Sequence, residues 1–94
     1  MLKILEELIT IIRDRKGSST EISYTNKLLN NKKLSVEKVK EEIAELIDAI
    51  EKNSNKIHEA ADVFYHLMVL LEANDIKIED VMKELKKRQK WIMI

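Results

Sequence analysis

Acidic side chains gather in two short clusters of this sequence. The first has the spacing E-E-x-x-E and the second the spacing E-x-x-D, and their members are Glu41, Glu42, Glu45, Glu59 and Asp62. Carboxylates three or four residues apart lie on the same face of an α-helix. If the two helices are neighbours, the five charges converge and repel one another unless a cation offsets them. The pattern therefore predicts a metal site that handles phosphates.

Magnesium suits such a site, because it is a hard cation that prefers oxygen ligands and keeps positions for water and substrate phosphates. There it would neutralise a polyphosphate and orient or activate a water for in-line attack on phosphorus. The chain has a single glycine, which excludes a glycine-rich phosphate loop. Side chains must therefore bind the phosphates, and the basic candidates are Lys27, Lys38 and Arg88.

A solvated helix surface is the alternative interpretation, since charged runs at helical spacing are usually of that kind. Two features argue against it. Glu42 and Glu45 border an apolar stripe between residues 36 and 50, and Glu59 and Asp62 fall on a helix that is apolar nearly all round. Buried carboxylates are unfavourable unless a cation or a basic side chain pairs with them. Salt bridges to Lys38, Lys27 or Arg88 are the alternative to a metal ion.

Helices of different length position these residues in the predicted fold. Apolar periodicity predicts a first helix at residues 2–15, stopped by Gly17, and a short helical segment toward the end of residues 23–29. Longer helices are expected at residues 36–52, capped by Ser35, at residues 56–73 and at residues 78–90. Since the helix at 56–73 is almost entirely apolar, we expect it to be central and buried.

The composition favours a single all-α domain over residues 1–94. Proline and cysteine do not occur, whereas helix-forming Glu, Lys, Leu, Ile and Ala dominate. A chain this short buries only roughly 60 to 65% of its unfolded surface. We therefore expect a bundle of four to five helices whose four-helix core is completed by dimerisation, and the bulky apolar residues 91–94 have nothing local to cover them.

Charge and hydropathy limit the partners. Seventeen basic and 17 acidic residues give a net charge of zero, so no overall field favours nucleic acid or a membrane surface. The longest apolar run, residues 63–71, is too short to span a bilayer. Glu6 and Glu7 interrupt the apolar N-terminal stretch, which argues against a signal peptide. We expect a cytoplasmic protein that binds neither nucleic acid nor membrane.

The two acidic motifs resemble those of the all-α nucleoside triphosphate pyrophosphohydrolase superfamily, which includes the MazG-like and dimeric dUTPase-like enzymes. Within it, Ser-Tyr-Thr-x-Lys-Leu at residues 23–28 and the segments 38–42 and 59–71 are similar to the phosphoribosyl-ATP pyrophosphatase family. The resemblance covers roughly Leu5 to Arg88. It implies Mg2+-dependent cleavage of the α,β bond of phosphoribosyl-ATP by a homodimer. The products would be phosphoribosyl-AMP and pyrophosphate, in the second step of histidine biosynthesis.

The resemblance also implies residue roles. The metal ligands would be Glu42, Glu45, Glu59 and Asp62. Glu41 would be an auxiliary ligand or a base that orients the water, so the catalytic set is Glu41, Glu42 and Glu45. Contacts to the substrate phosphates or ribose would come from Ser23, Tyr24, Thr25, Lys27 and Lys38, and His66 would support the site.

Two other hypotheses are compatible with the same residues. One keeps the chemistry but replaces the substrate with a free nucleoside triphosphate, as in MazG-like (d)NTP pyrophosphohydrolases. The other is a non-catalytic helical dimerisation module whose acids are solvated or salt-bridged. A module predicts no rise of the melting temperature with Mg2+, whereas a cation that binds only the folded form must raise it. Turnover of dNTPs relative to phosphoribosyl-ATP separates the two enzyme hypotheses.

Overall fold

The computed structural model describes residues 2–17 and 23–92. Every regular element in these ranges is helical, in the order α1 (Lys3–Asp14), the 3-10 turn η1 (Arg15–Gly17), α2 (Tyr24–Leu29), α3 (Lys32–Lys52), α4 (Lys56–Ala73) and α5 (Ile78–Ile92). The predicted all-α class is confirmed, while Met93 and Ile94 of the apolar C-terminus lie outside the described residues. None of the described helices combines the length and hydrophobicity needed to cross a lipid bilayer.

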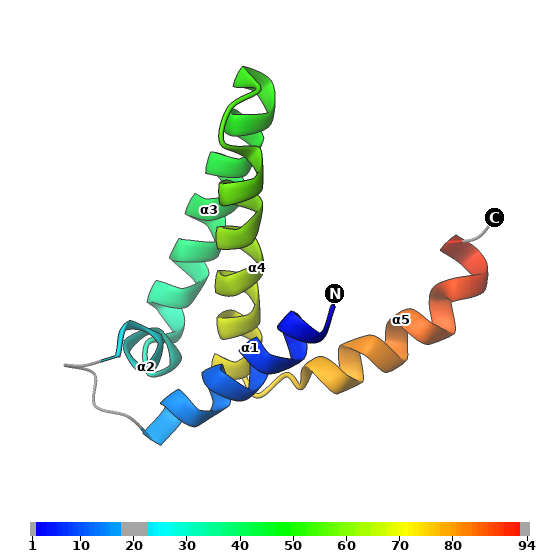
Figure 1. Cartoon of the computed structure of the whole chain (residues 1–94). Helices are drawn as coiled ribbons and strands as arrows, with labels where there is room; N and C mark the ends of the chain where they lie inside the picture. Colours follow the sequence, from blue (N-terminus) through cyan, green and yellow to red (C-terminus); the bar gives the residue numbers. More distant parts are fainter. Residues whose placement is uncertain (1, 18–22, 93–94) are drawn as a thin grey trace.

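Helices α3 and α4 form an antiparallel hairpin, the tall part of the molecule in Figure 1. Asn53 and Asn55 in the connecting turn have positive φ values of 53° and 56°, a region that Asn tolerates better than most residues. Within the turn, Ser54 N donates to Ala49 O at 3.0 Å and satisfies a carbonyl at the end of α3. This short connection sets the register in which the acids of α3 lie beside those of α4.

Helix α3 begins earlier than the predicted range 36–52. Asn31 is its cap, because its side-chain oxygen accepts a hydrogen bond from Leu34 N at 3.1 Å. Ser35, the predicted cap, instead lies inside the helix, 2% exposed, and its hydroxyl donates to Leu28 O at 2.6 Å. The prediction was wrong because Asn and Ser are equally good caps, and the contact with the end of α2 uses the Ser35 hydroxyl.

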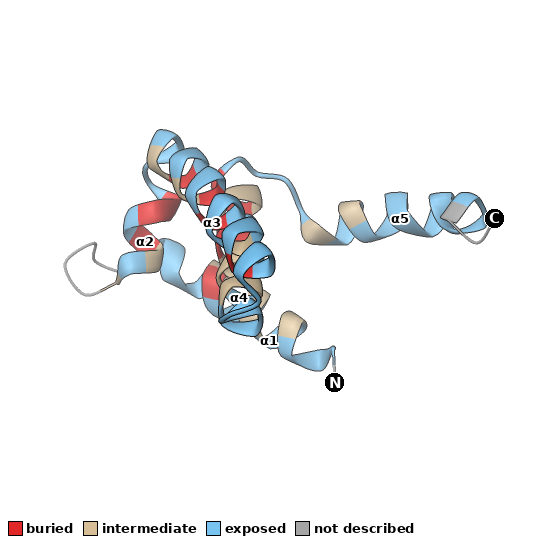
Figure 2. Cartoon of the chain, turned by 90° about the horizontal axis from the view of Figure 1, so that it is seen from above, coloured by how far each residue is buried: buried red, intermediate tan, exposed pale blue. Residues whose placement is uncertain are grey.

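The buried core lies at the base of the hairpin, where α1 and α2 pack against the C-terminal half of α4 (Figures 1 and 2). Its buried members are Ile12, Leu28, Leu29, Met68, Val69 and Ala73. The range predicted for α4 is confirmed, and α1 differs from its prediction by one residue at each end. The expected burial of α4 holds in its C-terminal half, so the acids of its N-terminal half stand above the core.

Helix α5 extends away from the hairpin (Figure 1). Arg13 of α1 holds its first turn, since the guanidinium donates two hydrogen bonds to the Glu79 carboxylate at 2.8 and 2.6 Å. Beyond that turn, apolar side chains of α5 such as Met82 and Leu85 are exposed. The helix is thus anchored at one end and presents apolar surface along its length.

Candidate active site

Each predicted acidic cluster converges on its own helix. On α3, single ligand atoms from Glu41, Glu42 and Glu45 lie within 4.8 Å of one another. On α4 the same limit is met by the triplet His58, Glu59 and Asp62. His58 was not among the predicted site residues, yet its Nε2 lies 3.4 Å from Asp62 Oδ2. The i, i+4 spacing from His58 to Asp62 is the signal that could have found it.

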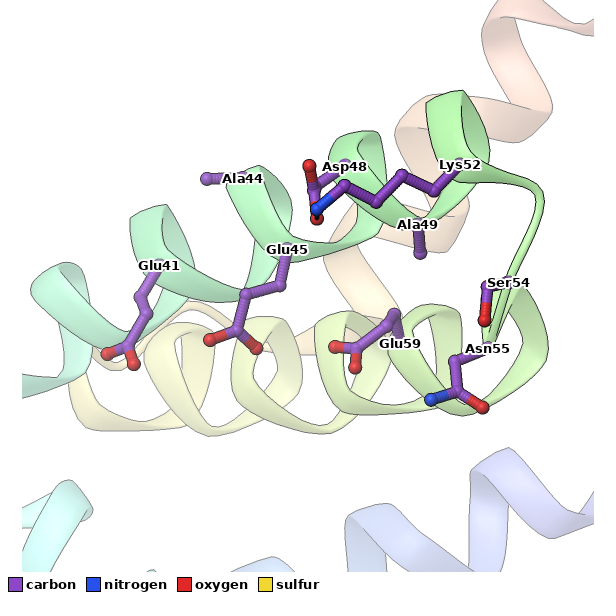
Figure 3. A pocket seen from close by; sticks show the side chains of 9 residues that line it. All are labelled: Glu41, Ala44, Glu45, Asp48, Ala49, Lys52, Ser54, Asn55 and Glu59. Carbon is purple, nitrogen blue, oxygen red and sulfur yellow. Dashed lines mark ion pairs between the residues drawn. The ribbon is translucent and has the colours of Figure 1, made fainter.

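The two clusters face a common space between the helices. Figure 3 shows the carboxylates of Glu41 and Glu45 from α3 and Glu59 from α4 pointing into it. Together they line a hollow of about 470 Å³ that extends to the turn after α3, where its other lining residues are Ala44, Asp48, Ala49, Lys52, Ser54 and Asn55. A ligand can therefore reach Glu41, Glu45 and Glu59 from the solvent, whereas Glu42 and Asp62 do not line this hollow.

Burial and mutual repulsion act together on the inner carboxylates. Burial raises the pKa of Glu42, which is 8% exposed, and the charges of Glu45 and Asp62 raise it further. Burial likewise raises the pKa of Glu59, and the charges of Glu45 and Asp62 add to the effect. The four predicted metal ligands are thus one electrostatic group, in which like charges oppose ionisation.

Two oxygens of this group have no hydrogen-bond partner among the described residues. Glu42 Oε2 and Glu59 Oε2 are buried and form no hydrogen bond with the part of the chain that the structure describes. Buried polar atoms are nearly always hydrogen-bonded in folded proteins, and the exceptions point to an ion, a water or a ligand. A divalent cation that prefers oxygen ligands satisfies both atoms and offsets the repulsion. The residues present therefore fit Mg2+.

The basic residues considered as alternative partners do not neutralise the inner acids. Lys38 Nζ lies 3.3 Å from an oxygen of Glu41, and this hydrogen bond raises the pKa of Lys38. Arg88 is paired within α5. Among the described residues, none of the ion pairs involves Glu42, Glu45 or Glu59. Only the outermost acid of the first cluster has the salt bridge that the alternative required.

The predicted substrate contacts on and next to α2 are of two kinds. Two of the side chains form hydrogen bonds within the protein, and two are exposed. Ser23 Oγ accepts a hydrogen bond from Asn26 N at 3.1 Å and caps the helix, and Thr25 Oγ1 shares a hydrogen bond with the Tyr65 hydroxyl. The Ser23 hydroxyl thus stabilises the start of α2, while the Thr25 hydroxyl holds α2 against α4. Tyr24 is 49% exposed and Lys27 is also exposed, so these are the α2 side chains that a substrate can reach.

His66, which was predicted to support the site, lies next to Asp62. It is buried on α4 one turn after Asp62, and its Nδ1 lies 2.9 Å from the backbone oxygen of that residue. Its ring stands edge-on to Tyr65, with centroids 4.9 Å apart, and to Tyr24, with centroids 6.3 Å apart. The structure thus places His66 between α2 and the metal-ligand candidates.

Sequence reasoning missed Asn26, a buried residue that anchors α2. Its side-chain amide donates to Arg15 O at 2.6 Å and to Lys16 O at 3.0 Å, which ties α2 to the end of η1. The signal that could have found it is its spacing of three residues before Leu29, a core position on the same helix face. Asn26 is a support for Tyr24 and Thr25 rather than a ligand itself.

Comparison with known proteins agrees with the extent of the resemblance. The chain matches the family model described as phosphoribosyl-ATP pyrophosphohydrolase over residues 5–89. The phosphoribosyl-ATP pyrophosphatase of Methanocella arvoryzae is 41% identical over 96% of this chain and all of its own length. That of Methanococcoides burtonii is 40% identical over 94% of each chain. The histidine biosynthesis bifunctional protein HisIE of Pyrococcus furiosus is 46% identical over 95% of this chain, which spans 43% of that longer protein. This chain therefore belongs to the phosphoribosyl-ATP pyrophosphohydrolase family.

Proposed function

We propose that the chain hydrolyses phosphoribosyl-ATP to phosphoribosyl-AMP and pyrophosphate in histidine biosynthesis, with Mg2+ held between α3 and α4. Family membership supports the reaction and makes the chain a phosphoribosyl-ATP diphosphatase. The observation that supports the cation is the pair of buried, unpartnered oxygens on Glu42 and Glu59 within a group of like charges. Of the three hypotheses drawn from the sequence, this is the one favoured.

Four of the five acids are proposed as metal ligands, and Glu41 has a separate role. In this proposal the cation is held by Glu42, Glu45, Glu59 and Asp62. Bound there, the cation would supply two kinds of chemistry: it would offset the charge of the phosphates, and it would make water a better nucleophile toward phosphorus. Glu41 is exposed and paired with Lys38, a position from which it can accept the proton of the water or add a ligand.

The substrate contacts follow from what each side chain already does. Lys38 is held only by its pairing with Glu41 at 3.3 Å, and it can exchange that partner for a phosphate oxygen. Tyr24 and Lys27 are exposed on α2 and are assigned to the ribose and phosphate groups. Ser23 and Thr25 contribute by fixing the start of α2, since their hydroxyls are engaged in protein hydrogen bonds.

A homodimer is part of the proposal. Large apolar side chains of the hairpin remain exposed in the single chain, namely Ile43, Ile47, Ile50, Phe64 and Leu67. Apolar surface of this kind is typical of association sites, and a chain of this size has little core of its own. We expect helices of two copies to share one bundle. Analytical ultracentrifugation of the wild type and of Ile47→Asp tests this, and a monomeric wild type contradicts it.

The reaction is tested by incubating the purified protein with phosphoribosyl-ATP and Mg2+ and measuring the pyrophosphate released. We expect release with Mg2+, none after chelation, and none from Glu42→Gln. Glu51→Gln, which changes an exposed acid of α3 outside the cluster, is the matched control and should retain the activity. Wild-type release by Glu42→Gln contradicts the site, and faster turnover of dNTPs than of phosphoribosyl-ATP contradicts the substrate.

A further inference from the structure

One ring nitrogen of His66 is bound and the other is not. Nδ1 lies 2.9 Å from the backbone oxygen of Asp62. The side chain is 8% exposed, and Nε2 is buried without a hydrogen bond to any described residue. The edge-on contacts with Tyr24 and Tyr65 fix the plane of the ring. The described residues thus explain the position of the imidazole and the hydrogen bond of Nδ1, but they provide no partner for Nε2.

The contact with Asp62 decides which nitrogen carries the hydrogen. A backbone carbonyl oxygen can only accept a hydrogen bond, so Nδ1 must be the donor. In the neutral imidazole Nε2 is then an acceptor with a lone pair. A buried acceptor that finds no donor destabilises the structure. The donor for Nε2 must therefore come from outside the described chain.

The neighbouring carboxylate indicates what that donor is. Across the hairpin, Glu42 Oε2 is also buried and unpartnered. Both side chains adjoin Asp62, because Nδ1 of His66 lies 2.9 Å from its backbone oxygen and its carboxylate adds to the repulsion that raises the pKa of Glu42. An ionised carboxylate accepts hydrogen bonds and does not donate them. A hydrated cation satisfies both atoms at once, because the carboxylate binds the metal while a metal-bound water donates to Nε2.

We propose that His66 is a positioning residue whose Nε2 accepts a hydrogen bond from a water molecule on the cation. The inference rests on the proposed function, since it requires a cation between α3 and α4. It gives Asp62 two tasks, because the carboxylate binds the cation while the backbone oxygen fixes the tautomer of His66. Outer contacts of this kind orient metal-bound groups, and their loss typically lowers metal affinity or activity by about 10- to 100-fold.

Two variants separate the two ring nitrogens. His66→Asn keeps an amide near the position of Nδ1 and removes the acceptor at Nε2, whereas His66→Gln carries its amide oxygen toward the position of Nε2. We expect His66→Asn to lower kcat for pyrophosphate release from phosphoribosyl-ATP by about 10- to 100-fold, with little change in KM. His66→Gln should recover most of the loss. Equal losses in both variants indicate a packing role and overturn the proposal, as does full activity of His66→Asn.

Binding of Mn2+ provides a readout that does not depend on activity. We expect Mn2+ titrated into the protein to bind more weakly to His66→Asn than to His66→Gln. Electron–nuclear double resonance of Mn2+ bound to ¹⁵N-histidine-labelled His58→Gln protein, in which His66 is the remaining histidine, should show no directly coordinated ¹⁵N. A strong coupling means that Nε2 itself is a ligand and overturns the proposal, even if His66→Asn fails to fold. Failure of the wild type to bind Mn2+ contradicts the proposed function as well.

Discussion

Two groups of charges in this molecule are built in opposite ways. At the base of the hairpin, Arg13 Nε lies 2.8 Å from Glu72 Oε1, and the same guanidinium holds Glu79. Lys16 Nζ lies 3.2 Å from the second oxygen of Glu72. The hydrogen bond from Arg13 lowers the pKa of Glu79 to about 2. Every charge of this base cluster has a partner, and the cluster joins α1, α4 and α5.

In the acidic group between α3 and α4, ion pairs with described residues reach only Glu41 and Asp62. Its inner members, Glu42 and Glu59, have raised pKa values because burial and neighbouring acids oppose their ionisation. Each group contains one buried glutamate on a helix, Glu72 in the base cluster and Glu42 in the acidic group. The difference is that the base cluster is complete within the chain, whereas the acidic group leaves two buried carboxylate oxygens without a partner among the described residues.

The largest expected difference between the two groups is in the activity that remains after one carboxylate is removed from each. Glu59→Gln deletes a proposed metal ligand, and we expect pyrophosphate release to fall at least about 100-fold, equivalent to roughly 3 kcal/mol of transition-state stabilisation. Glu79→Gln deletes an acid of the base cluster and should leave kcat unchanged under conditions where the protein is folded. Similar losses of kcat in the two variants, measured with phosphoribosyl-ATP and Mg2+, would remove the distinction between the groups.

Only one of these groups could be predicted from the sequence. The candidate metal ligands are spaced by about one helical turn within each cluster, and the apolar residues around them indicate both helices. The base cluster carries no local signal, since Arg13 and Glu72 are 59 residues apart and each looks like an ordinary charged residue on its own helix. Their pairing depends on how α1 crosses α4, which periodicity does not determine.

For the candidate site, the sequence predicted which residues are present but not what each hydroxyl contacts. The sequence motif identified Ser23 and Thr25, but the Ser23 hydroxyl caps α2 and the Thr25 hydroxyl bonds to Tyr65 of α4. The role of a hydroxyl depends on whether a protein acceptor is within reach, and that is a tertiary property. For the same reason Ser35 was predicted as a cap, whereas its hydroxyl reaches the end of α2.

Addition of Mg2+ should raise the thermal stability of the protein through the acidic group and not through the base cluster. A ligand present at 100 times its Kd stabilises the folded state by about 2.7 kcal/mol, which for a domain of this size raises Tm by about 10 °C or more. We expect this rise for the wild type against a chelated sample, monitored by circular dichroism. Arg13→Met should show the same rise from a lower starting Tm, because the base cluster does not bind the cation. An unchanged Tm of the wild type contradicts the cation site.

Disruption of the base cluster should affect stability rather than chemistry. Arg13→Met keeps the aliphatic stem and removes the hydrogen bonds to Glu72 and Glu79, so that the buried carboxylate of Glu72 retains only Lys16. We expect the free energy of unfolding in urea to fall by about 1 to 3 kcal/mol. Lys16→Met should have a smaller effect, since its ammonium group is more exposed. Unfolding midpoints equal to that of the wild type would show that the base cluster does not stabilise the folded state.

The smallest expected effects are on the Tm of the metal-free protein. Removal of an acid should raise the Tm in the acidic group and lower it in the base cluster. A carboxyl with a raised pKa in the folded state contributes stability below its unfolded pKa and loses it as the pH rises through the folded value. Ionised Glu42 therefore opposes folding at pH 7, and Glu42→Gln should raise the Tm slightly in chelator but lower it relative to wild type in Mg2+.

Glu79, whose pKa is lowered to about 2, contributes stability at pH 7 that disappears as the pH falls toward 2. Glu79→Gln should thus lower the Tm at pH 7, with a difference that shrinks in acid. Metal-free Glu42→Gln that melts below the wild type, with Glu51→Gln as the control, would mean that the acidic group is already balanced within the chain.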